Sequence, residues 1–151
     1  MRFEEDNFDD PRVIALLDAH VSRARAETGR GSAHALDLSG LKTPDIRFWT
    51  VWRGETLLGM GALKTLSRDH GEIKSMYTAE SARNQGVGRA MLTHIVAEAS
   101  TMGLARLSLE TGAWDYFGPA RAFYRRHGFV QCAPFADYQP DPNSVFMTRV
   151  L

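Results

Sequence analysis

The chain carries the stretch Arg83-Asn84-Gln85-Gly86-Val87-Gly88-Arg89 between a β-rich segment at 72–78 and an apolar helical stripe. Glycines let the backbone approach a ligand closely, and the unpaired amides of a helix's first turn, with the positive end of its dipole, attract phosphate oxygens. Arg83 and Arg89 would add charge-assisted contacts. The stretch therefore predicts a phosphate-binding turn, with a pyrophosphate as its natural ligand.

Two other interpretations compete with this one. A pair of glycines often makes only a tight turn into a surface helix. A dinucleotide-binding fold is the second, because Glu110 follows at the expected distance at the end of the next strand. It fits poorly, since Met91 occupies the third glycine position and about eight residues separate the strand end from Gly86.

Outward from this turn, the chain alternates helical and extended segments without a linker or an internal repeat. Capping and apolar periodicity predict helices from Asp10-Pro11 to Gly29, over 87–102 and over 119–127, with a loop or short helix within 31–44. Alternating and β-branched runs predict strands at 46–52, 56–66, 72–78, 104–110, 129–135 and 145–150. An antiparallel run that passes into one strand-helix-strand unit predicts an α/β (α+β) fold: a mixed sheet with helices on both faces.

Composition limits the classes of function. The chain has 151 residues, 44% of them hydrophobic, which suits one domain over 1–151. Eighteen basic residues balance eighteen acidic ones, so we expect no nucleic-acid partner. The single Cys132 excludes an internal disulfide. The acidic N-terminus and the lack of a long apolar run predict a cytoplasmic protein without a membrane partner.

Two motifs together resemble a known family. Arg83-x-x-Gly86-x-Gly88 looks like the acyl-CoA-binding motif of the GNAT family of N-acetyltransferases, and Ala120-x-x-Phe123-Tyr124-x-x-x-Gly128-Phe129 looks like its second hallmark. The similarity covers most of the chain in the same order of elements. It implies a largely antiparallel sheet of six to seven strands whose central parallel pair splays apart.

The resemblance also implies acetyl-CoA as the acyl donor. Strand-end backbone groups of Met76, Tyr77 and Thr78 would pair with its pantetheine arm. Its pyrophosphate would be held mainly by main-chain groups of the turn, at Arg83, Asn84, Gln85, Gly86, Val87, Gly88 and Arg89. Side-chain identity at Asn84, Gln85 and Val87 should therefore matter less than glycine at 86 and 88.

Tyr124 matches the tyrosine that protonates the departing thiolate in similar enzymes. A phenol with a pKa of about 10 stays protonated at neutral pH and can donate to a thiolate whose conjugate acid has a pKa of about 8–9. The competing interpretation is that Phe123 and Tyr124 are only core residues.

The amine that attacks must first lose a proton. A lysine-like amine has a pKa of about 10.4, so its neutral form costs roughly 4–5 kcal/mol at pH 7. By resemblance Glu72 is the general base, acting through an ordered water, and Glu110 is the competitor. Either glutamate would otherwise be a solvated carboxylate at a strand end.

One position departs from the family pattern. Where many relatives place an asparagine that contacts the cofactor arm, this chain has Phe117. The resemblance places the acceptor pocket near His34, Asp37, Trp49, Trp52, Trp114 and 135–143. These residues do not identify the amine.

The sequence thus predicts an acetyl-CoA-dependent N-acetyltransferase that acts on a primary amine of a small molecule or peptide, by direct attack in a ternary complex. A non-catalytic acyl-CoA sensor with the same fold is the alternative. His94 and Glu98 share a helix face without an evident third ligand, so we expect no metal. A homodimer is one assembly open to such a protein.

Overall fold

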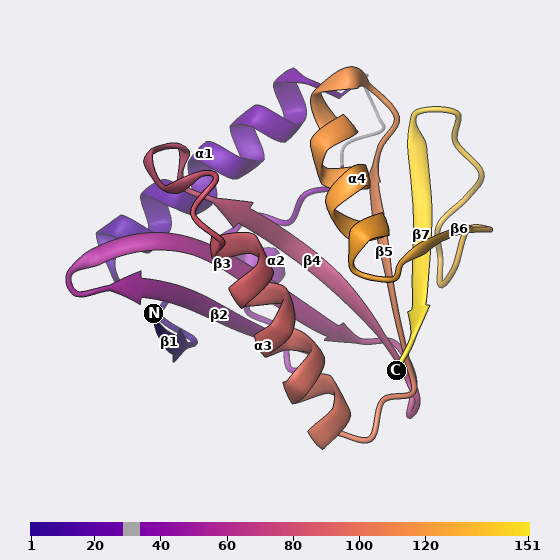
Figure 1. Cartoon of the computed structure of the whole chain (residues 1–151), viewed down its shortest axis with the longest axis horizontal. Coiled ribbons are helices and arrows are strands. Elements are labelled where there is room, and N and C mark those ends of the chain that lie inside the picture. Colours follow the sequence, from indigo (N-terminus) through magenta and orange to yellow (C-terminus); the bar gives the residue numbers. More distant parts are fainter. Residues whose placement is uncertain (29–33) are drawn as a thin grey trace.

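A computed structural model describes residues 1–28 and 34–151. Its centre is a seven-stranded sheet in the order β1-β2-β3-β4-β5-β7-β6 (Figure 1). The elements are β1 (Arg2–Glu5), α1 (Pro11–Ala26), α2 (Leu38–Leu41), β2 (Ile46–Arg53), β3 (Thr56–Thr65), β4 (His70–Thr78), α3 (Val87–Thr101), β5 (Arg106–Gly112), α4 (Gly118–Arg126), β6 (Val130–Cys132) and β7 (Ser144–Val150). Every strand pair is antiparallel except β4–β5, which confirms the predicted fold class.

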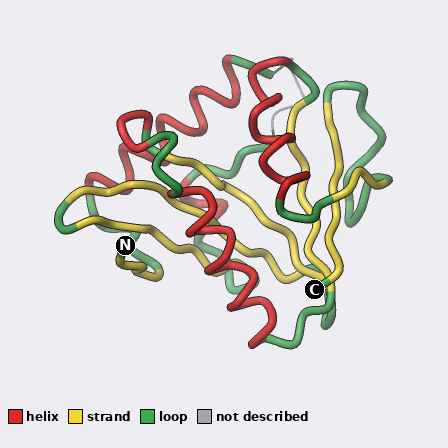
Figure 2. Tube along the Cα trace, in the orientation of Figure 1, coloured by secondary structure: helices red, strands yellow, loops and turns green. Residues whose placement is uncertain are grey.

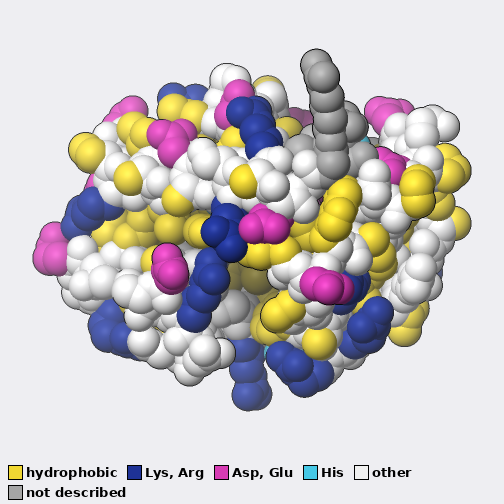
Figure 3. All heavy atoms as spheres, turned by 90° about the horizontal axis from the view of Figure 1, so that it is seen from above, with side chains coloured by type: hydrophobic (Ala, Val, Ile, Leu, Met, Phe, Trp, Pro, Cys, Tyr) yellow, Lys and Arg dark blue, Asp and Glu magenta, His cyan; other side chains and the backbone are white. Residues whose placement is uncertain are grey.

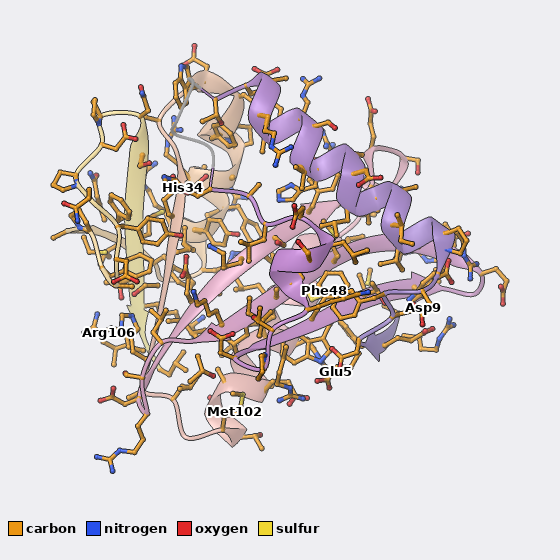
Figure 4. All side chains as sticks on the ribbon, turned by 180° about the vertical axis from the view of Figure 1, so that it is seen from behind. Glu5, Asp9, His34, Phe48, Met102 and Arg106 are labelled. Atoms are coloured by element: carbon orange, nitrogen blue, oxygen red, sulfur yellow. The ribbon has the colours of Figure 1, made fainter. Side chains whose placement is uncertain are left out.

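Helices cover both faces of the sheet. Helix α1 begins at its cap Asp10, whose side chain accepts a hydrogen bond from the Arg12 amide. Its buried residues Val13 and Leu17 pack in one apolar cluster with Phe48 of β2, which Figure 4 labels below this helix. Helices α3 and α4 lie on the opposite face and contribute to a second cluster.

Two glycines of β3 let α3 pack closely against the sheet. A Cβ atom at Gly59 would lie 2.9 Å from Val87 Cγ1, and one at Gly61 would lie 2.8 Å from Met91 Cγ. The helix therefore rests directly on the strand, which brings its N-terminus close to the end of β4.

The central parallel pair is short. Strands β4 and β5 pair only from His70–Arg106 to Glu72–Ser108, while β4 continues to Thr78 and β5 to Gly112. Beyond Glu72 the two strands diverge, as Figure 2 shows. The splayed pair is thus confirmed, and the edges of both strands that face the opening have no strand partner within 1–28 and 34–151.

Strand β4 contains a bulge just beyond this point. Ala62 pairs with Lys74 but Met60 pairs with Tyr77, so β4 carries one extra residue, and Ser75 has a φ of 55°. The extra residue keeps Lys74 and Tyr77 on the same face, although they are three positions apart.

The sequence did not predict β1, a charged edge strand that pairs with β2. The predicted strand at 129–135 is only Val130–Cys132, because Pro134 cannot donate to a ladder. Within 31–44 the structure has the short helix α2, while Gly29 and the first part of that loop lie outside the described residues. No helix in the described ranges is long and apolar enough to cross a bilayer.

Candidate active site

A cleft of about 1090 Å³ opens where β4 and β5 part. Its walls come from α1, the ends of β4 and β5, the first turn of α3, and α4. It brings together nearly all the predicted site residues, namely Glu72, Met76, Tyr77, Thr78, Arg83, Asn84, Gly86, Val87, Gly88, Arg89 and Tyr124. Gln85 does not line it, because its side chain bonds to Arg53 and to the Ser81 carbonyl.

The turn before α3 leaves backbone donors at the cleft. Gly86 is the N-cap with a φ of 79°, and no side chain of the described residues caps the first-turn amides. Such amides at a helix start favour an anion. Asn84 is also left-handed, with a φ of 63°. The turn therefore has the backbone geometry for phosphate that its glycines predicted.

Cationic side chains surround this end of the cleft. Arg83, Arg89 and Arg126 line it, and a guanidinium nitrogen of Arg83 lies 3.4 Å from the Tyr77 hydroxyl. Figure 3 shows apolar side chains recessed between Lys and Arg side chains when the molecule is seen from above. Apolar walls with a cationic rim suit a ligand that carries both an aliphatic arm and phosphates.

Tyr124 of α4 lies deep in the wall of the cleft. It is 7% exposed and packs edge-on against Phe123 and Phe129. Burial raises the pKa of its phenol, which keeps the hydroxyl protonated at neutral pH. Tyr124 is thus part of the core and a wall of the cleft at the same time.

Phe117 stands at the position for which the family resemblance implied an asparagine. Its ring lies on Gly112 at the end of β5, where a Cβ atom would overlap it. Arg121 fixes the same turn by donating to the Gly112 carbonyl at 2.7 Å and the Trp114 carbonyl at 2.9 Å. An aromatic contact therefore holds the strand end where an amide would otherwise sit.

Glu72 is held by two partners at the point where the strands separate. Its side chain is 3% exposed, and its Oε2 accepts from Lys74 Nζ at 3.1 Å and from the Tyr138 hydroxyl at 2.5 Å. Lys74 Nζ also donates to the Tyr138 oxygen at 3.0 Å. The three groups form a compact triad in which the buried Glu72 carboxylate makes an ion pair with the partly buried Lys74.

Glu110 lies on the other strand of the opening. Burial raises the pKa of its carboxyl group, while the charges of His34 and Lys74 oppose that shift and the charge of Glu72 adds to it. Both glutamates line the cleft, so both candidate bases that the sequence offered remain in reach of a ligand there.

Sequence reasoning missed two residues of the site, Lys74 and His20, and it did not foresee the contact between Tyr138 and Glu72. Lys74 could have been found, because it lies two positions after Glu72 and so on the same face of a strand. Tyr138 belongs to the 135–143 stretch that the resemblance placed near the acceptor, and it reaches the site from the β6–β7 connection. His20 of α1 contacts the Tyr77 ring at 4.9 Å, and burial lowers its pKa to about 4.

Several residues predicted near the acceptor lie elsewhere. Trp49 and Trp52 are buried in the two cores, because β2 is an interior strand covered on both faces. Asp37 caps α2 by accepting from the Gly40 amide. His34 does line the cleft, next to Tyr138.

Comparison with known proteins identifies the family. The sequence pattern of the Acetyltransferase (GNAT) family matches residues 9–129. The chain belongs to the GNAT family. It is 46% identical to the uncharacterized N-acetyltransferase YsnE of Bacillus subtilis (strain 168), over all of both chains. It is 44% identical to the uncharacterized N-acetyltransferase YedL of Escherichia coli (strain K12), over 97% of this chain and 92% of that one.

A solved GNAT-fold structure agrees with this assignment. It is a putative acyl-CoA N-acyltransferase from Klebsiella pneumoniae, with a TM-score of 0.83, 30% identity, and coverage of 99% of this chain and 97% of that one. The GNAT protein described here is therefore an enzyme of the N-acetyltransferase class, as its two motifs predicted.

Proposed function

We propose that this GNAT enzyme transfers an acetyl group from acetyl-CoA to a primary amine of a small molecule or peptide, by direct attack in a ternary complex. The observation that carries the proposal is a single cleft that joins the uncapped start of α3 to the opening between β4 and β5. A thioester placed in that opening would lie between Glu72 and Tyr124, which line the same cleft from different elements.

The main chain would supply most of the cofactor contacts. The diphosphate would bind the first-turn amides of α3 from Val87 to Arg89, with Arg83 beside them. The pantetheine arm would extend along Met76–Thr78, because that stretch of β4 has no β5 partner. Backbone groups there can complete their hydrogen bonds with the amides of the arm.

Glu72 would accept the proton of the amine. Lys74 and Tyr138 both use its Oε2 and hold the carboxylate in place at the opening. As the amine nitrogen attacks the thioester carbonyl, its proton passes to Glu72, directly or through a water. Glu110 is the alternative acceptor of this proton, since it lines the same space.

Tyr124 would complete the reaction as general acid. When the tetrahedral adduct collapses, the carbon–sulfur bond breaks and the sulfur takes the phenolic proton. CoA then leaves as its thiol. The amine has then gained an acetyl group and lost one proton to Glu72. The cycle closes when Glu72 gives up that proton to solvent and the tyrosine takes one back.

Calorimetry and thiol release test this function. Purified protein freed of cofactor should bind acetyl-CoA saturably, and CoA thiol should appear only when an amine acceptor is added. Absence of saturable binding would refute the cofactor assignment. Binding without acceptor-dependent release across amino acids, polyamines, aminoglycosides and peptide N-termini would instead identify an acyl-CoA sensor.

A further inference from the structure

A second pocket adjoins the cleft and reaches it through shared residues. Its volume is about 500 Å³, which is in the range of small-molecule sites. His34, Glu72, Lys74 and Tyr138 line both spaces. Figure 4 shows His34 on the side of the sheet that carries α1. The rest of the wall is Lys64 and 136–142, so the pocket extends away from the α3 turn where the phosphates would bind.

The floor of this pocket is a row of alternating charges on one face of the sheet. Lys64 of β3 is directly opposite Glu72 of β4, and Lys74 follows two positions later. Directly opposite residues and residues two apart point to the same face. Two ammonium groups thus flank one carboxylate, which leaves the floor with an excess of one positive charge.

The two lysines have capacity for a ligand. Lys74 is 11% exposed and its ammonium has three hydrogens, of which two are taken by Glu72 and Tyr138 in the described part of the chain. A buried ammonium is stabilised when its remaining donor also finds an acceptor. Lys64 makes no ion pair within 4.0 Å to a carboxylate in the described part of the chain, and its charge acts on Asp45 from a longer range.

Carboxylates occupy the other sides of the space. Glu110 lies across the opening on β5, where it would meet an incoming ammonium. Asp137 and Asp141 belong to the β6–β7 connection; Asp137 is exposed to solvent, and Asp141 accepts the Asn143 amide. Solvent weakens the field of exposed Asp137 relative to that of Lys74, whose side chain is 11% exposed. The pocket is therefore cationic on its floor, and acidic at the opening to the thioester and on the loop wall that carries Asp137 and Asp141.

We infer that the acceptor is a small amine that also carries a carboxylate, as an amino acid does, with the carboxylate on Lys74 and Lys64 and the amine directed into the β4–β5 opening. The inference rests on the proposed acetyl transfer. It adds the chemical class of the acceptor and assigns the second pocket as its binding site.

Matched acceptors test the inference. Amino acids and their carboxamides share the side chain and the amine but differ in the anionic group. Thiol release should give a kcat/KM at least about tenfold higher for the acids, the size expected of one charge-assisted contact. Carboxamides carry a less basic amine, so they would react as well or better if only the amine mattered. That result would overturn the inference while acetyl transfer stood.

A lysine variant gives a second readout. K64Q should raise the KM for the preferred amino acid about tenfold. The KM for the matching carboxamide and the Kd of acetyl-CoA should stay unchanged. K42Q is the matched control, because Lys42 caps α2 and lies over the Phe8 ring, outside both pockets. Equal KM values for wild type and K64Q would overturn the carboxylate site. Release with no acceptor at all would refute the proposed acetyl transfer itself.

Discussion

The Tyr138 hydroxyl donates a hydrogen bond of 2.5 Å to Glu72 Oε2, from a residue 66 positions later in the chain. The bond fastens the β6–β7 connection to the strand at the mouth of the opening. Burial and the neighbouring charge of Glu72 raise the pKa of the Tyr138 phenol, so it remains a donor at neutral pH. One loop thereby both orients the carboxylate and closes a wall of the second pocket.

Glu72→Gln should lower kcat by about 10²–10⁴-fold, because the amine proton loses its acceptor. Steady-state thiol release checks this, with thermal melting to confirm folding. Glu55→Gln, at a side chain that is 94% exposed, is the control and should match wild type. A larger loss in Glu110→Gln than in Glu72→Gln would assign the base role to Glu110.

Tyr124→Phe should retain the affinity for acetyl-CoA and lose about 10²-fold or more in kcat, since the packing is kept and only the proton donor is removed. Calorimetry gives the affinity and thiol release the turnover. If Tyr124→Phe kept the wild-type turnover, Tyr124 would have only a packing role and would not be the general acid.

Gly86→Ala should weaken acetyl-CoA binding at least about tenfold and destabilise the fold by about 1 kcal/mol, because a side chain rarely adopts a φ of 79° and relaxation would turn the α3 amides away. Gly54→Ala is a matched control: it has a φ of 58° and open space around its Cβ, but lies in the β2–β3 turn. Both variants should lose stability, and only the first should lose affinity in calorimetry.

Gly112→Ala should push the Phe117 ring off the end of β5 and lower both the melting temperature and the affinity for acetyl-CoA. Gly118→Ala should do neither, since its nearest contact would be the end of the Arg121 side chain at 3.7 Å. Differential scanning fluorimetry with and without acetyl-CoA measures both effects. If Gly112→Ala left both the melting temperature and the affinity for acetyl-CoA unchanged, the turn that carries Phe117 would be able to move without loss of stability.

His20 should make stability depend on pH. Burial lowers its pKa to about 4 from an ordinary value of about 6.5, so the unfolded chain binds a proton first as the pH falls. Because the fold keeps His20 neutral, the free energy of unfolding decreases as the pH falls from about 6.5 to about 4, by up to roughly 3 kcal/mol. Urea unfolding of wild type and His20→Gln should show a stability difference that changes with pH across this window and becomes constant above about pH 7. If the free energies of unfolding of the two proteins followed pH in parallel, the lowered pKa of His20 would be refuted.

The local parts of the site could be predicted from the sequence. The 83–89 turn, the start of α3 and the placement of Tyr124 on a short helix depend on glycine, proline and apolar spacing within one segment. Strand β1 could not, because its charged residues are stabilised by pairing with β2 and not by an alternating apolar pattern of their own.

The residues that surround the amine depend on contacts between distant segments. Tyr138 meets Glu72 only because β7 returns beside β5, and His20 meets Tyr77 only because α1 covers β4. The burial of Trp49 and Trp52 follows from the position of β2 inside the sheet, which their aromatic character alone does not reveal. Tertiary packing decides these positions, as it often overrides local preference.

The extra residue at Ser75 has a consequence for how this strand can vary. Because two residues of β4 share one position of the pairing here, Ile73 and Met76 both enter the core beneath α3, and Lys74 and Tyr77 both stay on the other face, although the members of each pair are three positions apart. Deletion of the extra residue would leave these four side chains on the same faces, since a regular strand alternates at every residue. What the deletion would remove is the local bend and twist that the bulge gives β4 where the strand pair opens.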